Sequence, residues 1–165
     1  MNDVAAAAGV ARGTLYRYFS SRQDLVDELA AVAMRGAAAR LSAARIGEVA
    51  PEDAIPRAIR ALIDIGPPFL AVARQRVRPD AAEFEREVTT PIRGLVKRAQ
   101  EEGVVRVDVS ATWLADSLVG LVVTALSASP HLGREDVVEA VTSQFLDGAR
   151  ARDASALRAQ GRRSA

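Results

Sequence analysis

Residues 3–22 read DVAAAAGVARGTLYRYFSSR, and they contain two short helical segments separated by a glycine turn. The first segment begins at Asp3, which is placed to cap it, and consists of strong helix formers. Gly9 stands where a chain leaving a helix commonly needs a positive φ. The second segment runs over about residues 12–19. Two short helices joined by such a turn are typical of a helix-turn-helix.

The second segment carries polar side chains of the kind that bind DNA. At 3.6 residues per turn, Leu15 and Phe19 share one face, which is expected to look inward. The outer faces then carry hydroxyl and guanidinium groups, on Arg12, Thr14, Tyr16, Arg17 and Tyr18. Such groups suit phosphate oxygens and base edges. On spacing alone, an ordinary surface helix whose tyrosines pack against neighbours explains the pattern equally well.

The exact amino-acid sequence of the segment decides between these interpretations. AGVARGTLYRYFSSR, residues 8–22, closely resembles the DNA-binding signature of the TetR family of bacterial transcriptional repressors, and the similarity extends over roughly residues 1–30. The resemblance implies contacts with base edges or the major groove from Arg12, Gly13, Thr14 and Arg17. It implies phosphate contacts from Thr14, Tyr16, Tyr18 and Arg22. It also implies a small packed core formed by Ala8, Val10, Leu15 and Phe19.

The chain departs from the family pattern at its start. Family members carry a full helix ahead of this motif, packed across both motif helices, whereas this sequence begins at Met1 beside the first motif helix. We expect the native start to lie upstream. The alternative is an incomplete DNA-binding domain, which is at the margin of independent stability.

The composition predicts an all-α protein with local rather than global basic charge. Of the 165 residues, 49% are hydrophobic and 26% are charged, which is ordinary for a globular chain. Alanine is abundant and β-branched alternation is scarce, so the fold class leans helical. The net charge is only +1, so DNA binding requires local clustering, which Arg12, Arg17 and Arg22 provide against Asp3 within residues 1–22.

The remaining sequence predicts a linker helix and a helical body. A helix begins at Ser20–Asp24, with a serine available as its cap and Asp24 in its first turn. It runs to about residue 44, with an apolar stripe of Leu25, Leu29, Val32, Ala33 and Ala37. Gly47 and Pro51 end this segment. We therefore divide the chain into a helix-turn-helix head with its linker helix (1–46), a ligand-binding and dimerisation body (47–150) and a basic, disordered tail (151–165).

Within the body, helix-breaking glycine and proline residues separate the expected helices. Ile55, Ala58, Ile59, Leu62 and Ile63 form the apolar face of a helix that begins at Pro51 and stops at Gly66-Pro67-Pro68. A short helix over 69–77 and a longer one over 79–102 follow. The longer one is interrupted at Thr90–Pro91, because a residue before proline is pushed away from the α region. Residues 103–109 are expected to be an extended linker.

The last two expected helices are the basis for predicting the oligomeric state of the chain. Residues 110–128 are apolar nearly all round, and such a helix must be buried on most sides. In the resembling family, the last two helices of each subunit form a four-helix bundle across a twofold axis. Applied here, this implies a homodimer through about 110–128 and 134–150. The alternative is that both helices complete a monomer core.

Other function classes find no support in the sequence. There is no Gly-rich phosphate loop, no nucleophile with a partner histidine and no cysteine, and the lone His131 lies in a loop. We therefore predict no enzyme activity, metal or cofactor. No basic-then-apolar leader and no uninterrupted apolar run of membrane-spanning length is seen, so a cytoplasmic protein without a membrane partner is expected.

The resemblance implies a regulator of transcription, with double-stranded DNA and a small molecule as partners. The function expected is that of a repressor released from a near-palindromic operator by a ligand. Candidate ligand contacts fall where the family keeps its pocket: Phe69, Arg74, Arg78 and Trp113. The alternative is a helical ligand-binding or protein-interaction dimer that no longer reads DNA.

Overall fold

A computed structural model describes residues 1–66, 81–128 and 132–151, and its regular elements in these ranges are helical. The elements are α1 (Asn2–Ala7), α2 (Arg12–Tyr18), α3 (Arg22–Ala43), α4 (Pro51–Ile63), α6 (Ala81–Phe84), a π-helical turn η1 (Glu85–Thr89), α7 (Thr90–Glu101), α8 (Ala111–Ala128) and α9 (Arg134–Ala149). The predicted all-α class is confirmed. The expected helix over 69–77 and most of the tail lie outside the described residues.

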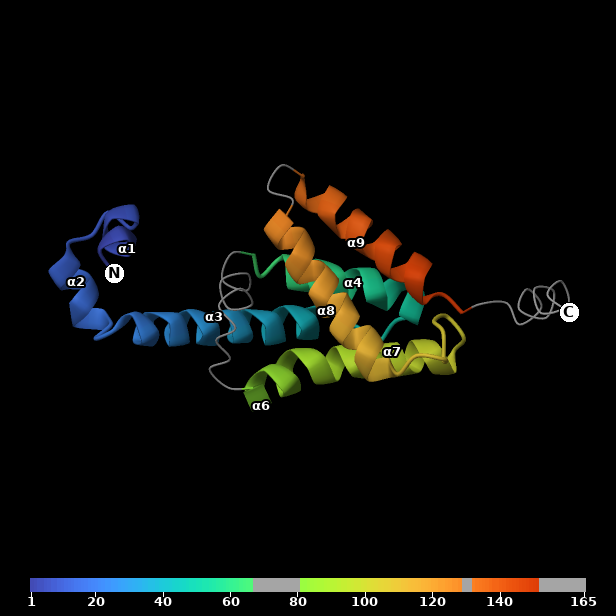
Figure 1. Cartoon of the computed structure of the whole chain (residues 1–165). Helices are drawn as coiled ribbons and strands as arrows, with labels where there is room; N and C mark the ends of the chain where they lie inside the picture. Colours follow the sequence, from blue (N-terminus) through green and yellow to red (C-terminus); the bar gives the residue numbers. More distant parts are fainter. Residues whose placement is uncertain (67–80, 129–131, 152–165) are drawn as a thin grey trace, which may run out of the picture.

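The molecule consists of a small head and a larger body joined by one long helix (Figure 1). α1 and α2 lie at one end of α3, which runs 22 residues into the body. There α3 packs against α4 and η1, while α4, α7, α8 and α9 pack on one another. The head is therefore presented to solvent at the end of a helical arm.

The head has the expected turn but different helix ends. Gly9 adopts φ +66, as predicted. Asp3 lies inside the first turn of α1 and makes no capping bond, so the predicted Asp3 cap is wrong. Its carboxylate still interacts favourably with the positive end of the helix dipole. Phe19 has left the helix, at φ −132 and ψ 108, because the next helix starts only three residues later.

The buried face of α3 is rotated from the predicted stripe. Ala33 and Ala37 are buried as expected, but Leu25 and Leu29 are half-buried and Val32 is exposed. The buried residues are instead Val26, Ala30, Ala33, Met34, Ala37 and Leu41. Because small alanines occupy this face, α4 and η1 can pack closely against α3 there. This close packing, rather than the burial of the larger Leu25 and Leu29, decides which face of α3 is buried.

The core of the body centres on α4. Ile55, Ile59 and Leu62 are completely buried, and the whole apolar face predicted for this helix is buried. Gly66, at φ +67, ends the segment as expected. Residues from α3, α7, α8 and α9 complete one continuous apolar cluster around it.

The predicted interruption near Pro91 takes the form of a π-helical turn. Thr90 stays in the α region at φ −63 and ψ −47, so the expectation that it is displaced is wrong. The irregularity lies in the preceding turn, where the Thr90 N–H donates to the carbonyl of Glu85. Pro91 has no N–H for the carbonyl of Glu87, which removes one α-helical bond and permits the wider turn.

The linker before α8 forms no strand, as predicted, but it is bent at residues 104 and 107–109 rather than extended throughout. It bonds to α9 through an antiparallel bridge between Val105 and Arg150, with the Arg106 N–H donating to the Ala149 carbonyl at 2.7 Å. It bonds to α7 through the Val104 and Val105 N–H groups, which donate to the Ala99 carbonyl at 2.8 and 3.2 Å. Val105 is completely buried. The linker therefore ties the end of α9 to the end of α7.

α8 is less buried than its composition predicts. Leu114, Ala115, Leu118 and Val122 face the core, but the expectation of burial on most sides is wrong for one chain. By length and composition alone, α8 is also apolar enough to cross a membrane, but a core helix meets the same criterion. Among the described residues it packs against α4, α7 and α9, while the side that carries Thr112, Asp116, Gly120 and Thr124 is exposed.

Candidate nucleic-acid interface

α2 presents most of the predicted DNA-contacting residues to solvent. Its inward side is fixed by Leu15, which is buried, and by the half-buried Phe19 just beyond its end. Tyr18 is 70% exposed and Tyr16 is 40% exposed. Arg12, Gly13 and Arg17 are exposed on the same helix, Thr14 is half-buried, and Arg22 is the exposed first residue of α3. The structure thus brings the predicted set together on one helix and the start of the next.

Both arginines of α2 stack on its tyrosines. The guanidinium carbon of Arg12 lies 5.2 Å from the centre of the Tyr16 ring, and that of Arg17 lies 5.2 Å from the centre of the Tyr18 ring. Such cation–π contacts restrict the long side chains without neutralising their charge. Each arginine is therefore partly ordered before any partner arrives, which lowers the entropy lost on binding.

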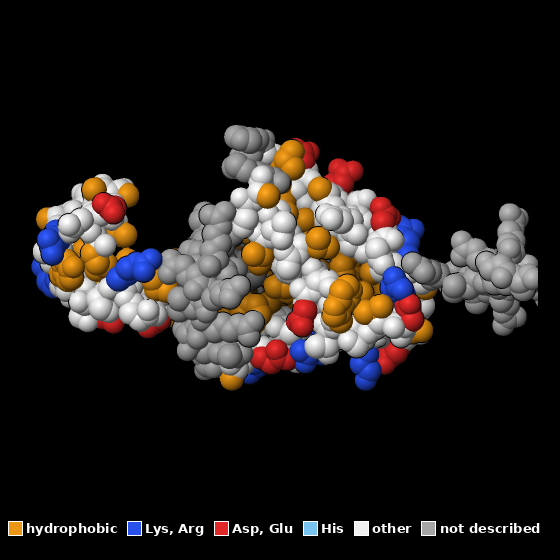
Figure 2. Space-filling view, in the orientation of Figure 1, with side chains coloured by type: hydrophobic (Ala, Val, Ile, Leu, Met, Phe, Trp, Pro, Cys, Tyr) orange, Lys and Arg blue, Asp and Glu red, His pale blue; other side chains and the backbone are white. Residues whose placement is uncertain are grey.

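The charges of the head lack the carboxylate partners that most body charges have. Within the described residues, Arg12, Arg17 and Arg22 make no ion pair. In the body, by contrast, Arg60 pairs with Glu135 and Arg134 with Asp64. Figure 2 shows basic side chains on the head and at its junction with α3. Exposed, unneutralised guanidinium groups attract phosphates, and base edges accept their bidentate hydrogen bonds.

The small core of the head is only partly formed as predicted. Leu15 is buried, but Ala8 is exposed and Val10 is 40% exposed, so the predicted packing of these two residues is wrong. Val4 is also 40% exposed. The physical reason is that α1 and α2 cover only each other's facing sides in the described part of the chain.

Two serines and an aspartate fix the junction of α2 and α3. The Ser21 hydroxyl accepts a hydrogen bond from the Asp24 N–H at 3.0 Å and donates to the Asp24 carboxylate at 2.7 Å. The Ser20 hydroxyl donates to the other carboxylate oxygen. These bonds hold the pKa of Asp24 below its ordinary value of 3.8, and the bond from Ser20 has the largest effect. The predicted serine cap is confirmed, and it sets how α2 joins the arm.

Replacing Ser21 with alanine is expected to loosen this junction. Loss of an N-cap costs about 1 kcal/mol of helix stability, so amide exchange over the first turn of α3 should quicken about fivefold or more. Ser143→Ala is the matched control, because Ser143 donates to Asp147 in mid-helix and caps nothing. Unchanged exchange in Ser21→Ala would show that the cap contributes nothing.

The same junction is expected to weaken in acid. A carboxylate whose folded pKa is depressed stabilises the folded form fully above its unfolded pKa, near 3.8, and loses this contribution as the pH falls through the lower folded value. Exchange over the first turn of α3 should therefore quicken below about pH 4 in the wild type, and less so in Asp24→Asn.

The predicted ligand contacts do not form a site among the described residues. Phe69, Arg74 and Arg78 lie outside these residues. Trp113 is 61% exposed on α8. These four contacts therefore remain a prediction.

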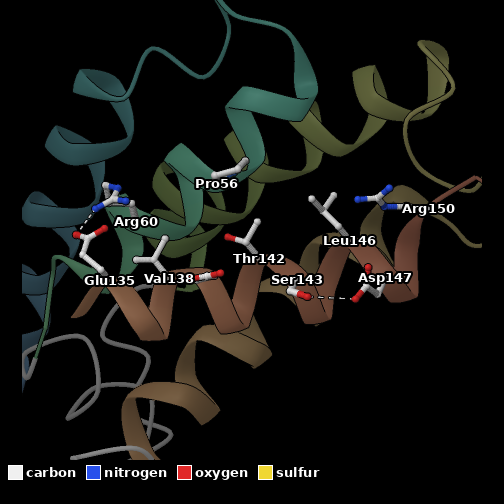
Figure 3. Close-up of a pocket in the computed structure, with 10 residues that line it drawn as sticks. Pro56, Arg60, Glu135, Val138, Thr142, Ser143, Leu146, Asp147 and Arg150 are labelled. Atoms are coloured by element: carbon white, nitrogen blue, oxygen red, sulfur yellow. Dashed lines mark hydrogen bonds and ion pairs between the residues drawn. The ribbon is translucent and has the colours of Figure 1, made fainter. Parts of the chain in front are cut away.

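A groove that the sequence did not indicate lies between α4 and α9 (Figure 3). Its volume is about 490 Å³, with Pro56, Val138 and Leu146 among its lining residues. At one end the Arg60 guanidinium bonds Glu135 and lowers the pKa of that carboxyl. The pair joins residues 75 positions apart, so no local sequence pattern could reveal it. No group of metal-ligating side chains occurs in the ranges that the structure describes.

Comparison with known proteins identifies similar proteins for the head and for the overall fold. Residues 1–29 match the family of bacterial regulatory proteins known as the tetR family. No curated protein matches the chain.

Several solved structures share the fold over most of the chain. The TetR-like transcriptional regulator LfrR from Mycobacterium smegmatis, solved in complex with proflavine, is 24% identical and aligns with a TM-score of 0.69 over 88% of this chain and 82% of its own. The ketosteroid transcriptional regulator KstR2 of Mycobacterium tuberculosis is 18% identical, with a TM-score of 0.72 over 91% and 84%. The regulator PfmR from Thermus thermophilus is 21% identical, with a TM-score of 0.69 over 88% and 86%. Residues 1–29 therefore match the tetR family, and the chain has the fold of TetR-like transcriptional regulators over most of its length.

Proposed function

We propose that this chain represses transcription by binding a near-palindromic operator as a homodimer, with α2 as the recognition helix. The observation that carries the proposal is the pair of exposed, stacked and unneutralised arginines, Arg12 and Arg17, in the segment that matches the family. These two arginines are the candidates for guanine contact, because a guanidinium forms two parallel hydrogen bonds to that base. Thr14, Tyr16, Tyr18 and Arg22 contact phosphates and set the register on the duplex.

The uncovered side of α8 supports the dimer. Thr112, Asp116, Gly120 and Thr124 recur every four residues along an exposed line, flanked by the half-buried Val119 and Val123. A Cβ added at Gly120 meets no atom within 4 Å, so the fold of one chain does not require a glycine there. A glycine in an exposed helix interior costs about 1 kcal/mol relative to alanine. Close approach of a second copy is a physical reason for keeping it.

Dimer geometry then fixes the form of the operator. Two recognition helices related by a twofold axis enter successive major grooves, so half-sites lie about 34 Å apart, or a multiple of this distance. The experiment that tests this is hydroxyl-radical footprinting on DNA upstream of the chain's own gene. The expected result is two symmetric protected half-sites on one face of the duplex. A single protected half-site, or none at saturating protein, would overturn the proposal.

Release by a small molecule is the proposed mode of control. LfrR, which shares the fold, was solved in complex with proflavine. In this chain a ligand is proposed to contact Phe69, Arg74, Arg78 and Trp113, and to favour a different spacing of the two heads. It shifts the population away from the DNA-binding state by no more than its difference in affinity for the two states. The protein is proposed to act in the cytoplasm and to catalyse no reaction.

A second candidate function is a helical dimer that no longer reads DNA. The partial exposure of Val4 and Val10 favours it, because a head with uncovered apolar side chains is less stable. The footprint separates the two functions, since this candidate predicts no protection.

Gly13 provides a test of how closely α2 approaches DNA. It lies in α2, a Cβ there meets no atom within 4 Å, and its φ is not positive. Gly13→Ala should therefore stabilise the free head by about 0.5–1 kcal/mol while weakening operator binding. Thermal unfolding and operator titration check the two effects. Stronger or unchanged DNA binding would show that no DNA group lies against this position.

A further inference from the structure

One side chain of α7 holds the turn in which α3 ends. The two terminal nitrogens of Arg98 form three hydrogen bonds: to the carbonyls of Ile46 at 2.6 Å, Gly47 at 2.9 Å and Val49 at 3.0 Å. The arginine is only 28% exposed, and Glu102 lies 3.8 Å from its Nε. The planar fork of a guanidinium can serve several carbonyls at once, which a lysine cannot do.

The bonds within the turn itself are local: the Glu48 N–H donates to the Arg45 carbonyl at 2.9 Å, and Arg45 pairs with Glu48. Among the described residues, the carbonyls of Ile46, Gly47 and Val49 accept no backbone hydrogen bond. The turn also contains Arg45 at φ 51, a left-handed conformation that a non-glycine residue adopts at a cost. The Arg98 fork therefore supplies the tertiary hydrogen bonds of these carbonyls, and together with the buried side chain of Ile46 it holds the path from α3 to α4.

The length of α3 magnifies any movement at this turn. An α-helix of 22 residues is about 33 Å long, so a tilt of about 5° at one end moves the other by about 3 Å. The head lies at that other end (Figure 1). Small changes at the turn become large changes in where α2 points.

α7 reaches the same region of α3 through a second contact. The turn η1, which leads into α7, packs against α3 with Val88 and Thr89 buried. Beside this contact lies an open surface pocket of about 360 Å³, lined by Leu41, Ile46 and Pro91 among others. The end of α3 is therefore not packed against the start of α7 along this whole side, and the Arg98 fork is a direct link between α7 and the turn that follows α3.

We propose that Arg98 is a positioning residue: by holding the carbonyls of residues 46, 47 and 49, it sets the orientation of the DNA-binding head relative to the body. A displacement of α7 is then passed to α3 through this fork. Only the consequence for DNA rests on the proposed function; the effect on head orientation does not.

The test measures one distance within a single chain. The protein has no cysteine, so Gln23→Cys on α3 and Glu139→Cys on α9, both exposed, accept spin labels specifically. Double electron–electron resonance is recorded with labelled chain diluted into excess unlabelled chain, so that only distances within one chain count. Arg98→Lys keeps the charge and loses the fork, and Arg98→Gln is the second variant. Lys97→Ala, an exposed neighbour on α7, is the matched control.

We expect a single narrow distance distribution in the wild type and in Lys97→Ala. Both folded Arg98 variants should show a distribution that is shifted or broadened by about 3 Å, as the length of the arm predicts. A lower melting temperature with an unchanged distribution would overturn the proposal, since it would show a purely structural role. In a separate operator titration, Arg98→Lys should lose about fivefold or more in affinity. If the wild type itself binds no operator, the proposed function fails while the distance measurement still decides the role of Arg98.

Discussion

Replacing Gly120 with arginine should convert the protein from dimer to monomer and abolish operator binding. The position is exposed in one chain, and a Cβ there meets no atom within 4 Å. Arginine is also the better helix former by nearly 1 kcal/mol, so the monomer should be at least as stable as before. Between two closely packed copies of α8, however, its long charged side chain has no room and no partner. Sedimentation velocity and operator titration measure the two losses.

Gly94→Arg is the matched control for this experiment. Gly94 is likewise an exposed helical glycine with open space around its Cβ, but it lies on α7. This variant should remain a dimer and bind operator as the wild type does. A dimeric Gly120→Arg protein would contradict the placement of the interface on α8. A monomeric variant with full operator affinity would contradict the need for a dimer.

Replacing Arg17 with alanine should remove base preference at specific positions of each half-site. A bidentate arginine–guanine contact contributes roughly 1–3 kcal/mol of discrimination, and a dimer makes the contact twice. Loss of both contacts corresponds to a factor of roughly 30 to 10⁴ in the preference of the operator over a sequence altered at those positions. Competition titrations with operators altered at the same position of both half-sites measure this factor position by position.

Tyr16→Phe serves as the contrasting variant. It keeps the ring on which Arg12 stacks and removes only the hydroxyl proposed to contact a phosphate. Affinity should fall by a similar factor for every duplex, because phosphate contacts carry no sequence information. If both variants weaken all sequences equally, the division between base-reading and phosphate-binding residues is wrong.

The sequence predicted the head well because local chemistry determines it. Gly9 at positive φ, the cap at Ser21 and the inward position of Leu15 each follow from residues within one or two turns of one another. The exposed tyrosines and arginines follow from the same helical periodicity. Local reasoning missed the absence of an Asp3 cap and the end of α2 before Phe19. It also missed the exposure of Ala8 and Val10, which depends on what other elements cover them.

In the body, local sequence patterns did not predict several features of the structure. The stripe on α3 was misplaced because alanines, which carry little hydrophobicity, line the side that α4 and η1 approach. The Arg98 fork and the Arg60–Glu135 pair join elements far apart in the chain, so no pattern within one element indicates them. The apolar character of α8 predicted burial on most sides, but within the described residues only Leu114, Ala115, Leu118 and Val122 are buried.

The central claim, that the chain reads a DNA sequence through α2, is tested most directly by fluorescence anisotropy. The 165-residue chain is titrated into labelled DNA from upstream of its own gene and into a shuffled duplex of the same composition, each at two salt concentrations. The proposal predicts a preference for the native duplex that survives the higher salt. Equal binding of both duplexes that vanishes at higher salt would reveal phosphate attraction alone, and would contradict the claim.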